Sequence, residues 1–195
     1  MRVLLALGFL AFSPALAYAH TGVEHSFGFV HGLEHPVGGI DHVLAMVAVG
    51  VFAYVLGGRA LWLVPLAFVS MMVVGFALGA AQIVMPMVEL GIALSSIAIG
   101  AVAASGLSMS AIAAMALVGV FALFHGHAHG AEMPVGASGL GYALGFVLAT
   151  ALLHLAGIAA SFGVARLAGR HGRSLAQIAG GVLALGGAGV LAGWL

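Results

Sequence analysis

Six long apolar runs, separated by short stretches that contain polar residues, constrain this chain more than any other feature. They cover residues 37–56, 61–82, 87–104, 108–127, 138–165 and 175–195. A helix needs about 20 mostly apolar residues to cross the hydrocarbon core of a bilayer. With 64% hydrophobic and 5% charged residues, a chain of 195 residues carries too little polar surface for a soluble domain. We therefore expect an all-α, polytopic membrane protein with a bundle of six transmembrane helices, in contact with the lipid bilayer.

Residues 1–19 have the pattern of a secretory signal peptide. Arg2 precedes a short apolar stretch at 3–12, and the small residues at 17 and 19 form a typical cleavage site. The alternative is an uncleaved first span, but about ten apolar residues are too few to cross a bilayer comfortably. Cleavage would place a mature N-terminus at His20, outside the membrane. Residues 20–36, rich in His and Glu, would then form an exterior arm before the six-span transmembrane domain at 37–195.

The arginines predict the orientation of the bundle. If the mature N-terminus lies outside, the loops after the first, third and fifth runs face the cytoplasm. The four arginines beyond the signal peptide all fall in or beside these loops: Arg59, Arg166, Arg170 and Arg173. This agrees with the positive-inside rule for membrane proteins. The five acids and eight of the ten histidines fall toward the outer side, whereas His154 lies within the fifth run and His171 is cytoplasmic.

Composition also excludes several classes of function. The chain has no cysteine, hence no disulfide and no thiolate metal site. Five arginines balance five acids, so nucleic acid is not an expected partner. No phosphate-binding loop of the G-x-x-x-x-G-K-[ST] type occurs, so the chain is not its own ATPase. No feature of the sequence indicates an oligomeric state.

The first chemistry-bearing motif lies at the start of the first apolar run and contains His35, Asp41 and His42. An ionised Asp near the centre of a membrane helix costs roughly 2.5 to 3.5 kcal/mol, and part of that cost remains near the interface. Imidazole and carboxylate side chains together suggest a site for a divalent transition metal. The alternative is a helix cap formed by Asp41, which would explain neither histidine.

The second motif lies at the outer end of the fourth run and contains His125, His129 and Glu132. If the chain stays helical here, these residues are four and then three positions apart, so they share one stripe of the helix. Two imidazoles and a carboxylate on one stripe are typical of helical metal sites. His127 would point elsewhere, toward solvent or another partner. The alternative is an exterior His-rich loop with no bound partner.

Together these motifs resemble the HupE/UreJ family of bacterial nickel and cobalt permeases. The similarity rests on His35-x5-Asp41-His42 and on the later stretch Phe124-His125-Gly126-x-Ala128-His129-Gly130-x-Glu132. It implies that residues 37–195 are the transport domain of a six-span permease in the bacterial inner membrane. Such a protein is not an enzyme and has no cofactor. It imports Ni2+ or Co2+ from the periplasm for the maturation of hydrogenase or urease. The metal ion is then the transported substrate. The resemblance implies these metal-binding positions: His35, Asp41, His42, His125, His129 and Glu132.

Two other functions remain open from the residues themselves. An intramembrane metal-dependent hydrolase could use a zinc-activated water beside Ser95, Ser96 or Ser105. A membrane metal-binding protein without transport is the other alternative. His154 is as consistent with a packing role as with a ligand, and Glu89 either begins the third helix or lines the entrance.

Overall fold

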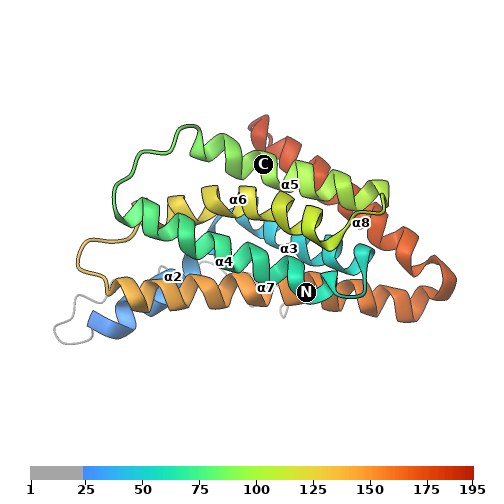
Figure 1. Ribbon diagram of the computed structural model, residues 1–195, viewed down its shortest axis with the longest axis horizontal. Coiled ribbons are helices and arrows are strands. Elements are labelled where there is room, and N and C mark those ends of the chain that lie inside the picture. Colours follow the sequence, from blue (N-terminus) through green and yellow to red (C-terminus); the bar gives the residue numbers. More distant parts are fainter. Residues whose placement is uncertain (1–23) are drawn as a thin grey trace, which may run out of the picture.

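The computed structural model describes residues 24–195, which form a bundle of helices without a β-strand in that range (Figure 1). The expected signal peptide at 1–19 and His20 lie outside the described residues. The elements are α2 (Glu24–Gly38), α3 (Ile40–Leu56), α4 (Ala60–Ala80), α5 (Val88–Ser105), α6 (Ala111–Ala131), α7 (Gly139–Ala168), the 3-10 turn η2 (Gly169–His171) and α8 (Gly172–Leu191).

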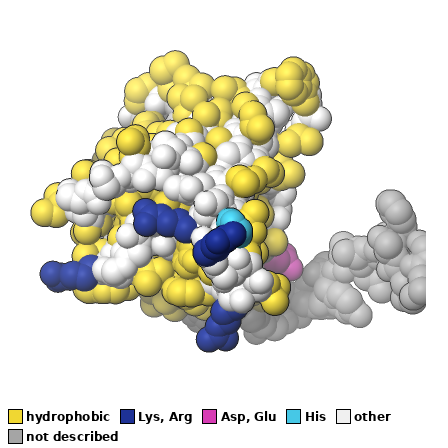
Figure 2. All heavy atoms as spheres, turned by 90° about the vertical axis from the view of Figure 1, so that its right-hand side faces the viewer, with side chains coloured by type: hydrophobic (Ala, Val, Ile, Leu, Met, Phe, Trp, Pro, Cys, Tyr) yellow, Lys and Arg dark blue, Asp and Glu magenta, His cyan; other side chains and the backbone are white. Residues whose placement is uncertain are grey.

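The helices α3 to α8 run back and forth along one direction, so their connections gather at two ends (Figure 1). The break between α2 and α3 and the α4–α5 and α6–α7 loops lie at one end, which we call the histidine end. The turns α3–α4, α5–α6 and α7–α8 lie at the other, which we call the arginine end. Figure 2 faces the arginine end, where the dark blue side chains gather. These side chains lie in or beside the α3–α4 and α7–α8 connections: Arg59, Arg166, Arg170 and Arg173.

The apolar helices are long enough for a multi-pass membrane protein. Four helical stretches of the described chain could each cross a bilayer, or five if the bent pair α2 and α3 counts as one span. One of these stretches, Gly139–Leu191, has 53 residues. The chain reverses at η2 within it, so α7 and α8 are separate passes (Figure 1). This arrangement agrees with the expected all-α, six-helix membrane bundle.

The first span was expected to begin at about residue 37, and α3 begins three residues later, after a separate helix. Residues 24–38 are themselves the helix α2, which continues through Pro36, and α3 begins at Ile40. The two helices meet at Gly39 with a bend of 82°. Packing explains why a Gly-rich, polar stretch is helical. The helix α2 lies along α7, and Gly32 is so close to the backbone of Tyr142 that a Cβ there would collide with its carbonyl oxygen.

The other five helices agree with the apolar runs to within a few residues. The largest extension is at α6, which continues to Ala131 rather than ending at residue 127. Ser110 caps the start of α6 by accepting a hydrogen bond from the amide of Ala113, at 3.2 Å. Ser138 does the same for Gly141 at the start of α7, also at 3.2 Å. The helix α3 packs against α4, α5, α7 and α8 and carries much of the buried core.

Glycines bring α4 and α6 into backbone contact along the helix that carries the second motif. A Cβ at Gly75 of α4 would collide with the carbonyl oxygen of Leu123 in α6, and one at Gly126 of α6 would collide with that of Met72. Small residues permit such close approach between membrane helices. This contact supports the last turns of α6, which hold His125 and His129.

Replacing Gly75 by Ala tests whether this close approach stabilises the bundle. We expect the Gly75→Ala substitution to lower the free energy of unfolding by about 1 to 3 kcal/mol, because the added methyl group must push α6 away from α4. The matched control is Gly163→Ala on α7, where a Cβ meets nothing within 4 Å. The free energy of unfolding of that variant should be unchanged or higher by up to about 1 kcal/mol, because Ala has a better helix propensity than Gly. Thermal unfolding of the purified proteins in detergent, followed by circular dichroism, measures both; equal stabilities would contradict the expectation.

Candidate functional site

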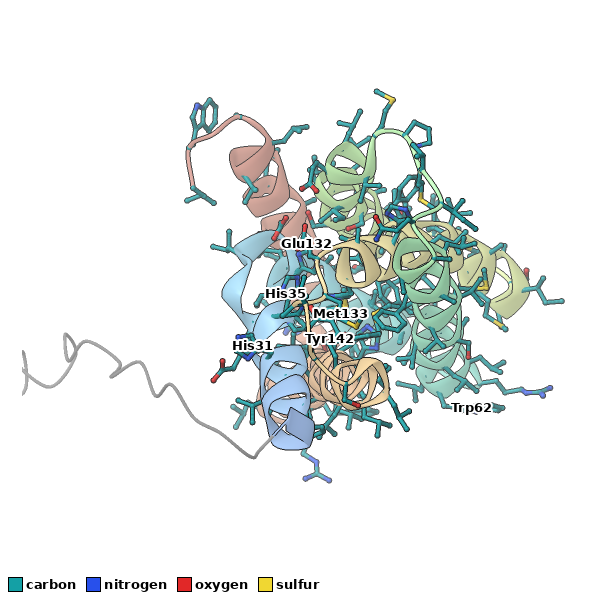
Figure 3. All side chains as sticks on the ribbon, turned by 90° about the vertical axis from the view of Figure 1, so that its left-hand side faces the viewer. His31, His35, Trp62, Glu132, Met133 and Tyr142 are labelled. Atoms are coloured by element: carbon teal, nitrogen blue, oxygen red, sulfur yellow. The ribbon has the colours of Figure 1, made fainter. Side chains whose placement is uncertain are left out.

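The ends of three helices bring the predicted site residues to the histidine end of the bundle. The last turn of α2 supplies His35, the first turn of α3 supplies Asp41 and His42, and the last turns of α6 supply His125 and His129. Glu132 follows α6 directly as its C-terminal cap residue. Figure 3 looks onto this end and shows His35 near Glu132 and Tyr142. All six predicted residues therefore lie in one region, although they come from three helices separated in the sequence.

His35 contacts both the acid and the buried part of this region. Its Nε2 lies 3.2 Å from a carboxylate oxygen of Glu132, whose side chain is 53% exposed. On the inner side, its ring contacts His129, with centroids 4.8 Å apart. His35 thus connects the solvent-facing carboxylate with the buried imidazoles.

Asp41 and His42 form a pair at the start of α3. One carboxylate oxygen of Asp41 accepts the backbone N–H of His42 at 2.8 Å and lies 3.0 Å from His42 Nδ1. The carboxylate therefore orients the His42 ring, whose Nε2 is buried without a hydrogen-bond partner. Asp41 is not the cap residue of α3, which is Gly39; it lies in the first turn, accepts one amide there and also holds this imidazole.

His125 is fully buried and is held from the side by Ser95 of α5. Ser95 Oγ lies 2.9 Å from His125 Nε2 and donates its own proton to the carbonyl of Ile92, at 2.6 Å. The other ring nitrogen, Nδ1, has no hydrogen-bond partner. Sequence reasoning named Ser95 only as a possible partner in hydrolysis. Its contact with His125 spans two helices, and no sequence pattern indicates it.

His129 lies between the other imidazoles. Its ring is fully buried, stacks on Phe146 at 4.7 Å and contacts His42 at 5.3 Å. Neither ring nitrogen has a hydrogen-bond partner. Because buried polar atoms are rarely left unpaired, two free nitrogens on one ring indicate a place where a ligand can bind.

The spacing of the rings suits imidazoles that share a cation. A metal ion lies about 2.1 Å from an imidazole nitrogen, so the centroids of two rings on one ion are about 5 Å apart. His42 and His125 are 4.7 Å apart by this measure, and His42 and His129 are 5.3 Å apart. The rings meet edge to face, however. Within residues 24–195, no three His, Asp or Glu side chains already point their donor atoms at one point. Binding a cation would require side-chain rotations.

A cavity of about 410 Å³ opens beside these side chains at the histidine end. Three of its lining residues were not among the predicted site residues: His31 and Glu34 of α2, and Glu89 in the first turn of α5. Glu89 lies at the start of the third apolar helix and also lines this cavity, so it occupies both of the positions expected for it. The other lining residues are Gly38, Gly39 and four predicted ones: His35, Asp41, His42 and Glu132.

Two further residues near the site are His127, whose direction the helical spacing predicted, and Tyr142, whose position it did not. His127 points away from the site, as expected, and its Nε2 lies 2.7 Å from the carbonyl oxygen of Ile83 beyond α4. Tyr142 of α7 was not predicted, yet its buried ring contacts His35 at 6.1 Å. Its position follows from the packing of α2 along α7, which no local pattern indicates.

Comparison with known proteins gives a family. The family described as "HupE / UreJ protein" matches residues 7–190 of this chain. The chain is also similar to "Protein HupE" of Rhizobium leguminosarum bv. viciae, with 46% identity over 181 residues that cover 92% of each chain. No solved structure matches it. The matched length includes both histidine motifs and all of the helices described above except the last residue of α8. The chain therefore belongs to the HupE/UreJ family, as its two motifs indicated.

Proposed function

We propose that this protein is a permease that imports a divalent transition metal ion, most readily Ni2+ or Co2+, across the bacterial inner membrane. The observation that carries the proposal is the meeting of four imidazoles from three helices beneath a cavity lined by carboxylates. These are His35, His42, His125 and His129. Imidazole and carboxylate ligands suit Ni2+, Co2+ and Zn2+. The family resemblance favours nickel or cobalt, supplied to the maturation of hydrogenase or urease.

The distribution of charge supports the direction of transport. The four carboxylates that line the cavity and the four clustered imidazoles lie at the histidine end, while the arginines lie at the opposite end (Figures 2 and 3). The positive-inside rule assigns the arginine end to the cytoplasm, so the cavity would face the periplasm. Acids at its mouth attract cations from that side, whereas the arginines repel cations at the other end.

The hydrogen bonds around the rings prepare lone pairs for the ion. The Asp41 carboxylate can only accept, so it favours a proton on Nδ1 of His42 and leaves a lone pair on Nε2. Ser95 has its proton on the carbonyl of Ile92, so it accepts Nε2–H from His125 and leaves the lone pair on Nδ1. Partners of this kind hold metal-binding histidines in one tautomer and orientation. The site would bind moderately, so that the ion can leave again.

The hydrolase alternative has less support from these contacts. A serine nucleophile needs a base that takes its hydroxyl proton. The Ser95 proton is directed to the carbonyl of Ile92, so His125 is not placed as its base. Metal binding without transport remains the other alternative, and an uptake measurement separates it from a permease.

Substitution of the Asp41–His42 pair tests the proposal directly. We expect Asp41→Asn and His42→Ala to reduce Ni2+ uptake about ten-fold or more, because each removes a ligand or its orienting partner. Uptake of radioactive nickel into cells or proteoliposomes measures this, with protein level in the membrane checked in parallel. His171→Ala, an exposed histidine at the arginine end, is the control and should transport normally.

The same assay with Co2+ and Zn2+ as competitors identifies the preferred metal. Wild-type protein that binds Ni2+ but does not move it into vesicles would overturn the permease proposal. Normal uptake by both the Asp41→Asn and His42→Ala variants would overturn the assigned site.

Ser95 and its neighbour Ser96 provide a matched test of the tautomer argument. Both hydroxyls are buried on α5 and bond to a carbonyl one turn earlier, but only Ser95 contacts a histidine. We expect Ser95→Ala to weaken Ni2+ binding about ten-fold, within the range seen when such orienting partners are removed. Ser96→Ala should leave it unchanged. Equilibrium Ni2+ binding to the purified proteins measures both, and equal affinities for the two variants would contradict this role of Ser95.

A further inference from the structure

His154 is a buried imidazole that is not part of the outer cluster, the name we give to His35, His42, His125 and His129 at the histidine end. It lies near the middle of α7, is 1% exposed, and neither of its ring nitrogens has a hydrogen-bond partner. Buried polar side chains of folded proteins nearly always have a partner, so a ring with two unpaired nitrogens requires an explanation. Intramembrane ionisable residues commonly mark the path of an ion or substrate.

The aromatic ring of Phe68 connects His154 to the outer cluster. Phe68 of α4 is fully buried and meets His154 edge to face, with centroids 5.1 Å apart. The same ring contacts His125, at 5.6 Å. Ring contacts therefore run without interruption from the cavity to the middle of the bundle. The rings in contact are His35, His129, His42, His125, Phe68 and His154, of which His35 and His42 line the cavity.

A hydrogen bond joins the same two helices, α4 and α7, one turn away from the Phe68–His154 ring contact. The hydroxyl of Thr150, four residues before His154 on α7, donates to the sulfur of Met72, four residues after Phe68 on α4, at 3.6 Å. Both side chains are fully buried. A thioether is a soft ligand for late transition metals. The α4–α7 contact thus holds an imidazole and a thioether in a part of the bundle that is otherwise apolar.

The surroundings of His154 offer its ring nitrogens no hydrogen-bond partner. An apolar groove of about 430 Å³ between α4 and α7 borders His154, and its other lining residues include Trp62, Leu66 and Leu155. Acyl chains in such a groove offer no hydrogen-bond donor or acceptor. They would leave both nitrogens of His154 unpaired, whereas a metal ion would use one of them.

We propose that His154 is an inner metal ligand, which binds the ion after it leaves His125 and before it reaches the arginine end. This step rests on the proposed permease function and extends its path to the middle of the membrane. Few ligands are present there, so the inner site binds weakly and favours onward release. Movement of the Phe68 side chain would open the passage between the two imidazoles.

The test separates binding at the outer cluster from passage through the membrane. His154→Phe keeps a buried ring but removes both nitrogens, and His154→Gln keeps a polar group. His171→Phe is the matched control at the arginine end. For each protein, equilibrium binding of Ni2+ in detergent and the initial rate of Ni2+ uptake into proteoliposomes are measured.

We expect both His154 variants to bind Ni2+ within about two-fold of wild type, while His154→Phe lowers the uptake rate about ten-fold or more. His154→Gln should fall between His154→Phe and wild type, and His171→Phe should match wild type in both measurements. Uptake by His154→Phe and His154→Gln at the wild-type rate would overturn the inner site. So would a parallel loss of binding and uptake in a folded His154→Gln protein, because the residue would then support the outer cluster.

Two controls keep the outcome decisive. If His154→Phe fails to fold, as judged by its elution on size exclusion, the His154→Gln variant carries the same comparison. If wild-type protein shows no uptake, the permease proposal fails and this inference fails with it. If wild type transports and the His154 variants do so equally well, only the inner site is rejected.

Discussion

The sharp bend at Gly39 is the constraint on which the histidine site depends. It turns the chain by 82° between α2 and α3, so that His35 from one helix and His42 from the next face the same end of α6. A side chain at Gly39 would crowd the Asp41 carboxylate and the His42 ring, since a Cβ there would lie 2.7 Å from Asp41 Oδ1. A straight helix across this stretch would send His35 and His42 to positions about 10 Å apart along its axis.

The site combines polar side chains with an apolar bundle at an energetic cost. His125 and His129 are fully buried, and three of their four ring nitrogens lack a hydrogen-bond partner. The close contact of α4 and α6 through glycine offsets part of this cost by holding the last turns of α6 in place. The outer cluster and His154 both contain buried ring nitrogens without a hydrogen-bond partner. This agrees with the proposed path, along which a cation would take the place of the missing partners.

Much of this arrangement could be predicted from the sequence. The apolar runs predicted five of the helices closely, and the i, i+4 spacing of His125 and His129 correctly placed both on the inner side of α6 while His127 points away. These inferences depend on local periodicity and on the length of a membrane span, which are properties of single segments. The sequence predicted residues 20–36 only as a polar arm; that most of this stretch is the helix α2 depends on its packing against α7, a contact between segments far apart in the chain.

Other features depend on contacts between segments far apart in the chain. Neither the support of His125 by Ser95 nor the contact of Tyr142 with His35 has a sequence signature, because each depends on the rotation of two packed helices. The connection from His125 through Phe68 to His154 joins three helices and is equally invisible in the sequence.

The sequence by itself determined that this chain is a multi-pass helical membrane protein with imidazoles and carboxylates at helix ends. Hydropathy and residue spacing are sufficient for that, since the bilayer imposes the length of each span and the helix imposes which residues share a face. Only the tertiary structure decided which of these polar groups meet, at what distance and with which nitrogens unpaired. Those properties depend on the bend at Gly39 and on the close approach of glycine-bearing helices, and both arise from packing between segments.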